Sequence, residues 1–150
     1  MFKTKIFLFL GIIPFLGMVY SFNSKSDVPQ DSDLIGYYFI DEEGVLFTLR
    51  IVKEDGEMTG RHCWTDQLSV GDDCTPRNGR SLANPEIINV NTVQFTFRTY
   101  YGMGAENESN YYGKVKLTLQ DENTLLWEIT EQPEGRTVIP DELTLERYQE

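Results

Sequence analysis

The chain has 150 residues, of which 24 are acidic and 13 basic, so its formal net charge at neutral pH is −11. This length is typical of one domain, and 40% of the residues are hydrophobic, which is enough to fill a core. The strong negative charge argues against a protein that holds nucleic acid or an anionic membrane. It attracts cationic molecules instead, and it also keeps a protein soluble.

The N-terminus has the three-part layout of a secretory signal peptide. Lys3 and Lys5 form a cationic head, and residues 6–20 form an uncharged apolar run. Side chains of small or moderate size lie at the end of this run, where a signal peptidase cleaves. The apolar run is shorter than the roughly 20 residues that a membrane-spanning helix needs. We therefore expect residues 1–21 to be removed, with cleavage after Ser21 or Asn23, and the product to be exported to the periplasm or secreted. An uncleaved membrane anchor is the alternative.

The next segment, residues 22–33, is polar and lacks an apolar period, which predicts a flexible leader. Residues 34–150 are then expected to form a single domain. Without Lys3 and Lys5, 11 basic residues face 24 acidic ones, and the net charge of the mature chain becomes −13.

From residue 34 onward the chain shows strand signals. Apolar and polar side chains alternate with a period of two, as where Phe47, Leu49 and Ile51 share one face, and no window has the period of a helix. Short acidic turns such as Asp55-Gly56 separate the windows, and a long loop follows the third. The predicted strands are residues 34–40, 45–52, 57–65, 86–90, 92–99, 111–119, 124–130 and 143–147.

This pattern predicts an all-β fold. Seven or eight short strands joined by tight local turns favour a small antiparallel up-and-down β-barrel, which also removes exposed sheet edges. A two-sheet β-sandwich is the alternative.

Cys63 and Cys74 are the only cysteines. In an exported chain with an even cysteine count, we expect them to form a disulfide that ties the loop between them back to the preceding strand. Closing a loop of this size stabilises the fold by about 2–3 kcal/mol in the chain-entropy model.

Candidate catalytic residues are few. His62 is the only histidine and shares the phase of Met58 and Trp64, so we expect a hydrogen-bonded core residue and not a general base. Acidic neighbours such as Asp72 and Asp73 are expected to be solvated turn residues. Because no hydrolase, phosphate-binding or metal-binding motif is present, we predict a non-catalytic protein without a metal site or cofactor.

The segment that most resembles a recognition surface is residues 100–112, a loop rich in tyrosine, glycine and acidic residues. Tyrosine supplies rigid contact area with a polar tip, and neighbouring glutamates steer a basic partner. The alternative is a hairpin whose tyrosines cover the end of the barrel. The residues predicted to bind a partner are Tyr100, Tyr101, Met103, Glu106, Glu108, Tyr111 and Tyr112.

Two groups of residues resemble small exported bacterial β-barrel proteins, many of them uncharacterised. One is a C-terminal pattern of Leu125, Trp127, Ile129, Ile139, Pro140 and Leu145, and the other is His62-Cys63-Trp64 with Asp73-Cys74. The resemblance implies a barrel fold and a location in the cell envelope, and it transfers no catalytic residues.

Two functions follow. The first is an acidic binding module for a cationic envelope hydrolase, in the manner of lysozyme inhibitors and immunity proteins. The second is a carrier of a small apolar ligand, in the manner of avidin or lipocalins. We expect no nucleic-acid partner and no membrane contact after signal cleavage. The aromatic residues expected to form the core or line a cavity are Phe39, Phe47, Trp64, Phe95, Phe97 and Trp127.

Overall fold

The computed structural model describes residues 33–42, 44–66, 71–101, 111–135 and 137–149, and within them it contains strands and no α-helix. The predicted signal peptide and nearly all of the predicted leader lie outside this range. The nine strands are β1 (Gly36–Glu42), β2 (Val45–Glu54), β3 (Glu57–Asp66), β4 (Asp73–Cys74), β5 (Leu82–Asn89), β6 (Thr92–Arg98), β7 (Tyr112–Leu119), β8 (Thr124–Glu131) and β9 (Glu142–Arg147).

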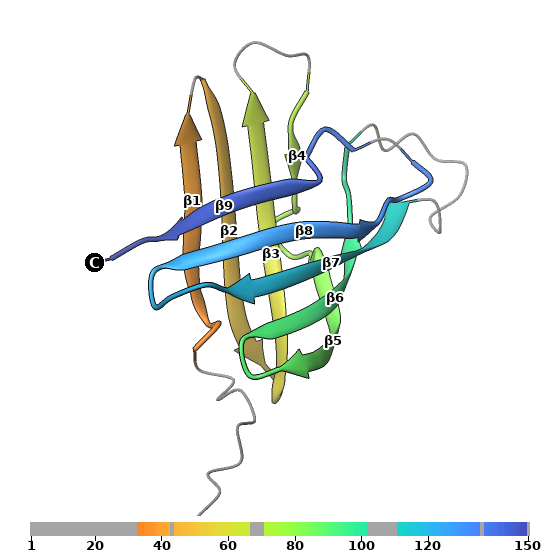
Figure 1. The fold of residues 1–150 in the computed structure, drawn as a ribbon. Coiled ribbons are helices and arrows are strands. Elements are labelled where there is room, and N and C mark those ends of the chain that lie inside the picture. Colours follow the sequence, from red (N-terminus) through yellow and green to blue (C-terminus); the bar gives the residue numbers. More distant parts are fainter. Residues whose placement is uncertain (1–32, 43, 67–70, 102–110, 136, 150) are drawn as a thin grey trace, which may run out of the picture.

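Eight of these strands close into an antiparallel barrel, which confirms the predicted fold and decides against the sandwich (Figure 1). Going round the barrel the order is β2, β1, β9, β8, β7, β6, β5 and β3, and β3 pairs with β2 to complete the ring. Neighbours in the barrel are therefore consecutive in the chain, apart from β4 and the closing pair of β1 and β9. The additional strand β4 lies outside the ring and pairs with β3.

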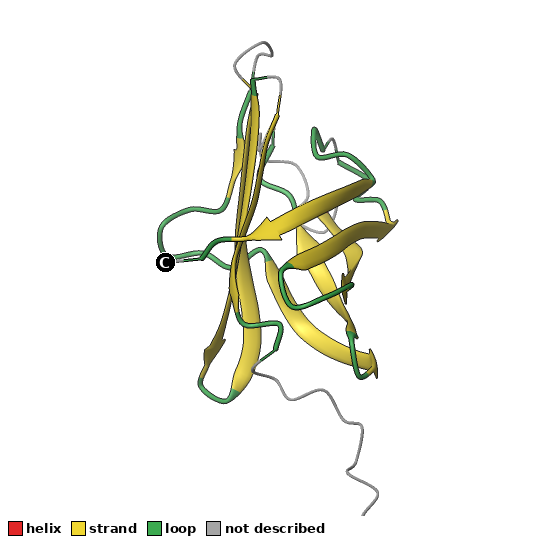
Figure 2. Ribbon diagram, turned by 60° about the vertical axis from the view of Figure 1, so that its left-hand side comes forward, coloured by secondary structure: helices red, strands yellow, loops and turns green. Residues whose placement is uncertain are grey.

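The barrel has two halves whose strands cross steeply (Figures 1 and 2). β1, β2 and β3 stand upright in Figure 1, whereas β7, β8 and β9 run across them. The strand pairing at the two seams between these halves is short. β1 pairs with β9 at Tyr38↔Arg147 and Phe39↔Glu146, and β3 pairs with β5 at Gly60↔Leu82. Parts of the strands at each seam therefore diverge from their neighbours.

The hairpin of β2 and β3 forms as its turn residues predict. Asp55 and Gly56 have φ angles of 54° and 87°, and this pair of left-handed conformations is typical of a type I′ turn. The two strands pair without a register shift from Glu54↔Glu57 to Val45↔Asp66. This turn therefore fixes which side chains of β3 point into the barrel.

The barrel is filled by its own large side chains. Trp127 is fully buried, and its ring lies 5.2 Å, centroid to centroid, from the rings of both Phe47 and Phe97. The buried Tyr38 donates its hydroxyl hydrogen to the Leu34 carbonyl oxygen at 3.1 Å, which holds the segment before β1 against the core. The other buried hydrophobic residues are Leu49, Ile51, Met58, Trp64, Leu82, Val93, Phe95, Val115, Leu117, Leu125, Ile139 and Leu145.

Several boundaries differ from the predicted ones. β1 begins at Gly36 and continues through Glu42, where a turn was expected, because its acidic end pairs with β2. β5 begins at Leu82 instead of residue 86. Asn84, which has a left-handed φ of 51°, and the proline that follows it hide the start of this strand, and the pairing with β6 shifts register there. β4 was predicted as part of a loop.

Candidate binding surface at the disulfide end of the barrel

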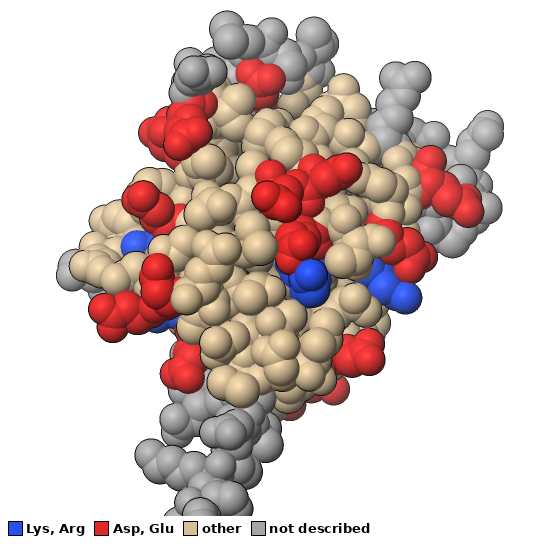
Figure 3. Space-filling model, in the orientation of Figure 1, with Lys and Arg blue, Asp and Glu red and all other residues tan. Residues whose placement is uncertain are grey.

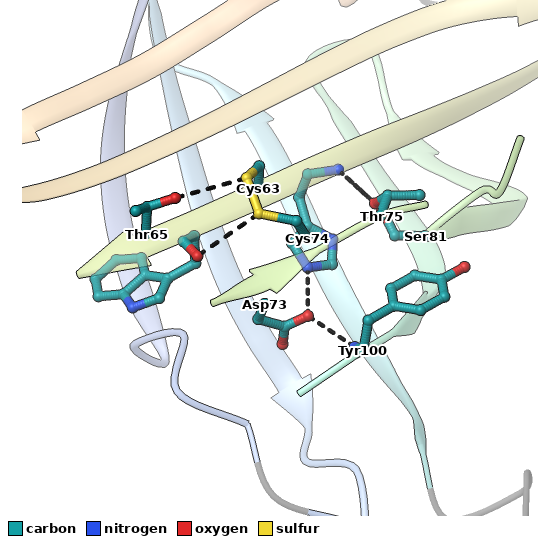
Figure 4. Close-up of a disulfide and its surroundings, with 9 residues drawn as sticks. Cys63, Thr65, Asp73, Cys74, Thr75, Ser81 and Tyr100 are labelled. Atoms are coloured by element: carbon teal, nitrogen blue, oxygen red, sulfur yellow. Dashed lines mark hydrogen bonds and ion pairs between the residues drawn. A yellow bond between two sulfur atoms is a disulfide. The ribbon is translucent and has the colours of Figure 1, made fainter. Parts of the chain in front are cut away.

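Cys63 and Cys74 form a disulfide, as predicted (Figure 4). Cys63 lies on β3 and Cys74 lies directly opposite it on β4, so the bond links two paired strands. The pairing is extended by the Thr75 amide, which donates to the His62 carbonyl oxygen at 2.8 Å. The disulfide holds the segment after β3 against the barrel.

Next to the disulfide, His62 and Asp73 form a buried pair (Figure 4). His62 is buried on β3 and its Nε2 atom lies 3.0 Å from an Asp73 carboxylate oxygen, while neither side chain is exposed to solvent. The same carboxylate accepts a hydrogen bond from the Thr99 hydroxyl. It also accepts one from the Tyr100 amide at 2.7 Å (Figure 4). Asp73 therefore joins β3, β4 and the end of β6.

The pKa of Asp73 reflects these contacts. Burial by itself raises the pKa of a carboxyl, but the hydrogen bonds and electrostatic attraction from His62, with the further hydrogen bonds from Thr99 and Tyr100, outweigh burial and hold the pKa below 3.8. The carboxylate is thus ionised at neutral pH. The expectation that Asp73 is a solvated turn residue was wrong, because β4 turns its side chain into the barrel, whereas Asp72 is exposed.

The surroundings of His62 are those of a core residue. The rings of Phe47 and Phe97 lie 6.1 and 5.3 Å from its imidazole, and the Trp127 ring lies 6.4 Å away. A side chain without solvent exposure cannot meet a substrate, and we therefore assign the pair with Asp73 a structural role.

The tyrosines predicted to bind a partner lie at this end of the barrel. The Arg98 guanidinium lies over the rings of both Tyr100 and Tyr112, at 5.0 and 5.4 Å from their centroids. Tyr112 keeps 41% of its surface exposed. Tyr101 and Tyr111 are partly exposed, and Met103, Glu106 and Glu108 lie outside the described residues.

Tyr100 is anchored through its hydroxyl group. Its hydroxyl donates to the Arg80 carbonyl oxygen at 2.7 Å, and burial raises the pKa of this hydroxyl above 10.0. This hydrogen bond ties the end of β6 to the segment after β4, and the predicted role of Tyr100 in binding a partner stays a prediction. Tyr112 is exposed, whereas Tyr100 and Tyr101 are half-buried, so Tyr112 offers the most surface to a partner.

Five of the six candidate aromatics are buried, namely Phe47, Trp64, Phe95, Phe97 and Trp127. Phe39 is the exception, because it follows the outward phase of β1 and contacts the ring of Tyr148 at 6.3 Å.

Within the described ranges, no group of three or more His, Cys, Asp or Glu residues is placed to hold a metal ion. The same part of the chain holds no helix of the length and apolar character that crossing a membrane requires.

The chain was compared with protein-family models, with curated proteins and with solved structures, and none of them matched. The resemblance to small exported bacterial barrels therefore stays a prediction that rests on the residues quoted for it.

Sequence reasoning did not single out Thr99 and Arg98 as residues of this surface. Both occupy the end of a predicted strand, where the alternation gives no sign of a contact with β4 or with the ring of Tyr112. No local signal distinguishes them, because the contacts join segments that are distant in the sequence.

Proposed function

We propose that this protein is an exported, non-catalytic binding module that associates with a cationic protein, in particular a basic hydrolase of the cell envelope. The observation that carries the proposal is the filled centre of the barrel. Trp127, Phe47 and Phe97 are fully buried and fill the centre of the described barrel with their own rings, where a ligand carrier would have its pocket. This packing favours binding through the outer surface over carriage of a small apolar ligand.

The charge of the chain supports a basic partner. Acidic side chains outnumber basic ones in Figure 3, and two of the lysines are already paired, Lys114 with Glu131 at 3.1 Å and Lys116 with Glu128 at 2.8 Å. A mature chain with a net charge of −13 accelerates encounter with a basic protein and repels acidic ones. The disulfide fits an oxidising compartment, which agrees with the predicted export.

The tyrosine-bearing end supplies the contact area. Tyr101 and Tyr112 extend from a region that the disulfide, Asp73 and Tyr100 make rigid. Rigid aromatic side chains contribute strongly to interfaces because little rotamer freedom is lost on binding.

The test is capture of binding proteins from envelope extract and culture fluid by the purified mature domain at low and at high salt. We expect capture of a basic hydrolase that weakens with salt, and inhibition of that enzyme when the domain is added to it. Tyr101→Ala combined with Glu106→Gln should reduce both effects. Ile88→Ala combined with Glu86→Gln removes one exposed apolar side chain and one charge on β5, and it should leave them unchanged. A captured enzyme that keeps full activity would refute inhibition, and a small molecule that copurifies in place of any protein would refute the proposal.

A further inference from the structure

The seam between β1 and β9 opens into a cleft. The two strands pair at Tyr38↔Arg147 and Phe39↔Glu146 and then diverge, so that beyond Phe39 the end of β1 and the beginning of β9 do not pair with each other. A cleft with a volume of about 350 Å³ lies between them. It is lined by Phe39, Ile40, Asp41, Glu42, Thr144 and Glu146. In Figure 1, β9 crosses the upright β1 and leaves the upper end of β1 uncovered on that side.

The backbone of β1 turns polar groups toward this cleft. Successive residues of a strand direct their N–H and C=O groups to opposite sides, so every second residue of β1 faces the same neighbouring strand. Tyr37 faces β9, because its carbonyl oxygen accepts from the Tyr148 amide at 2.8 Å. By this alternation Asp41 also directs its N–H and C=O groups toward β9 and therefore into the cleft.

The backbone of β9 matches it from the opposite wall. The Arg147 amide donates to the Asn123 carbonyl oxygen on the side of β8, at 2.7 Å, whereas the Tyr148 amide donates to β1. Counting back by two from Tyr148, Glu146 and then Thr144 direct their groups toward β1. Glu146 meets β1 at the seam, while the Thr144 groups face the cleft. Two polar strand edges thus border one opening, and an extended chain fits between two such edges.

The side chains around the cleft define what kind of chain would fit. Asp41, Thr144 and Glu146 lie on the outer face and are exposed, and neither carboxylate forms an ion pair within the described part of the chain. On the inner face, Ile40 is partly buried against the core, and Glu42 follows it in the same phase at the exposed end of β1. A strand entering here would meet negative charge on its outer side, and Ile40 followed by the Glu42 carboxylate on its inner side.

We propose that the cleft between β1 and β9 binds an extended segment of a cationic protein by strand addition. Lysine or arginine side chains at alternate positions of the segment face Asp41 and Glu146, and an aliphatic side chain between them contacts Ile40, beside the Glu42 carboxylate at the end of β1. The proposal rests on the proposed function for the charge of the partner, and it adds a second contact, separate from the tyrosine-bearing end.

The test uses a blocked peptide of alternating lysine and valine, seven residues long, titrated into the domain at low ionic strength. We expect binding, with slower hydrogen exchange at the Asp41 and Thr144 amides. A peptide of the same composition with its lysines in one block, and a peptide N-methylated at alternate residues, should bind at least tenfold more weakly. If the N-methylated peptide binds equally well, or if neither amide is protected, strand addition is refuted.

Matched variants separate the cleft from general charge. Asp41→Asn with Glu146→Gln should weaken binding of the alternating peptide at least tenfold, whereas Glu86→Gln with Glu122→Gln, which changes the net charge equally at exposed sites elsewhere, should weaken it less than threefold. Equal losses in the two variants would overturn the assignment to this cleft. Capture of a basic hydrolase that is as strong with the cleft variant as with the original chain refutes this inference and leaves the proposed function intact. If the alternating peptide binds but no protein is captured, the strand-binding cleft is supported and the proposed function is refuted.

Discussion

Replacement of Asp73 by alanine should destabilise the domain more than any other change to a single acidic residue of the described chain. The carboxylate accepts hydrogen bonds from His62, Thr99 and Tyr100, and it is fully buried. Its removal leaves these three donors without their acceptor, and each hydrogen bond to a charged group contributes about 1.5–3 kcal/mol. Because such losses are not additive and breaking a buried pair costs about 3–5 kcal/mol, we expect the free energy of unfolding to fall by about 3–5 kcal/mol.

Urea unfolding with the disulfide intact measures this loss. The matched control is Asp72→Ala, which removes the neighbouring exposed carboxylate and should change the free energy of unfolding by about 0.5 kcal/mol or less. Asp73→Asn, which keeps the shape and one acceptor oxygen, should fall between the two. Equal midpoints for the Asp72 and Asp73 variants would show that the buried network does not hold β4 in place.

Three further predictions concern the same core. Reduction of the disulfide should lower the free energy of unfolding by about 2–3 kcal/mol, and the variant with serine at both Cys63 and Cys74 should not respond to reductant. Trp127→Ala should cost about 3–5 kcal/mol, since it removes the fully buried ring between Phe47 and Phe97, and a cost near that of a surface substitution would show a loosely packed centre. Because the folded-state pKa of Asp73 lies below 3.8, the stability from this carboxylate should be fully present above that value and be lost as the pH falls through the folded pKa. Urea midpoints measured against pH should therefore fall less steeply below pH 3.8 in Asp73→Asn than in the original chain.

Much of the barrel follows from local patterns in the sequence. The alternation of Phe47, Leu49 and Ile51 marks the inner face of β2, and the Asp55-Gly56 turn fixes the register with β3. These signals lie within a few residues of one another, so they can be interpreted without knowledge of distant contacts. The disulfide followed from the cysteine count and the predicted compartment.

The remaining features depend on contacts between distant segments. β4 has two residues, too few to show an alternation, and Asp73 becomes a core residue because it meets His62 and Thr99. The cleft between β1 and β9 arises from the steep crossing of the first and last strands, which no local pattern records. The sequence singled out the tyrosines at this end of the barrel but not the buried network beside them, and the binding role of the tyrosines stays a prediction.

Native mass spectrometry of the protein isolated from its own source, sprayed from solutions of low and of raised ionic strength, tests the central claim most directly. We predict a mature chain that begins near residue 22, carries one disulfide, and at low ionic strength forms a one-to-one complex with a basic protein that dissociates as the salt rises. A chain bound to a small molecule and to no protein at either ionic strength would contradict the account.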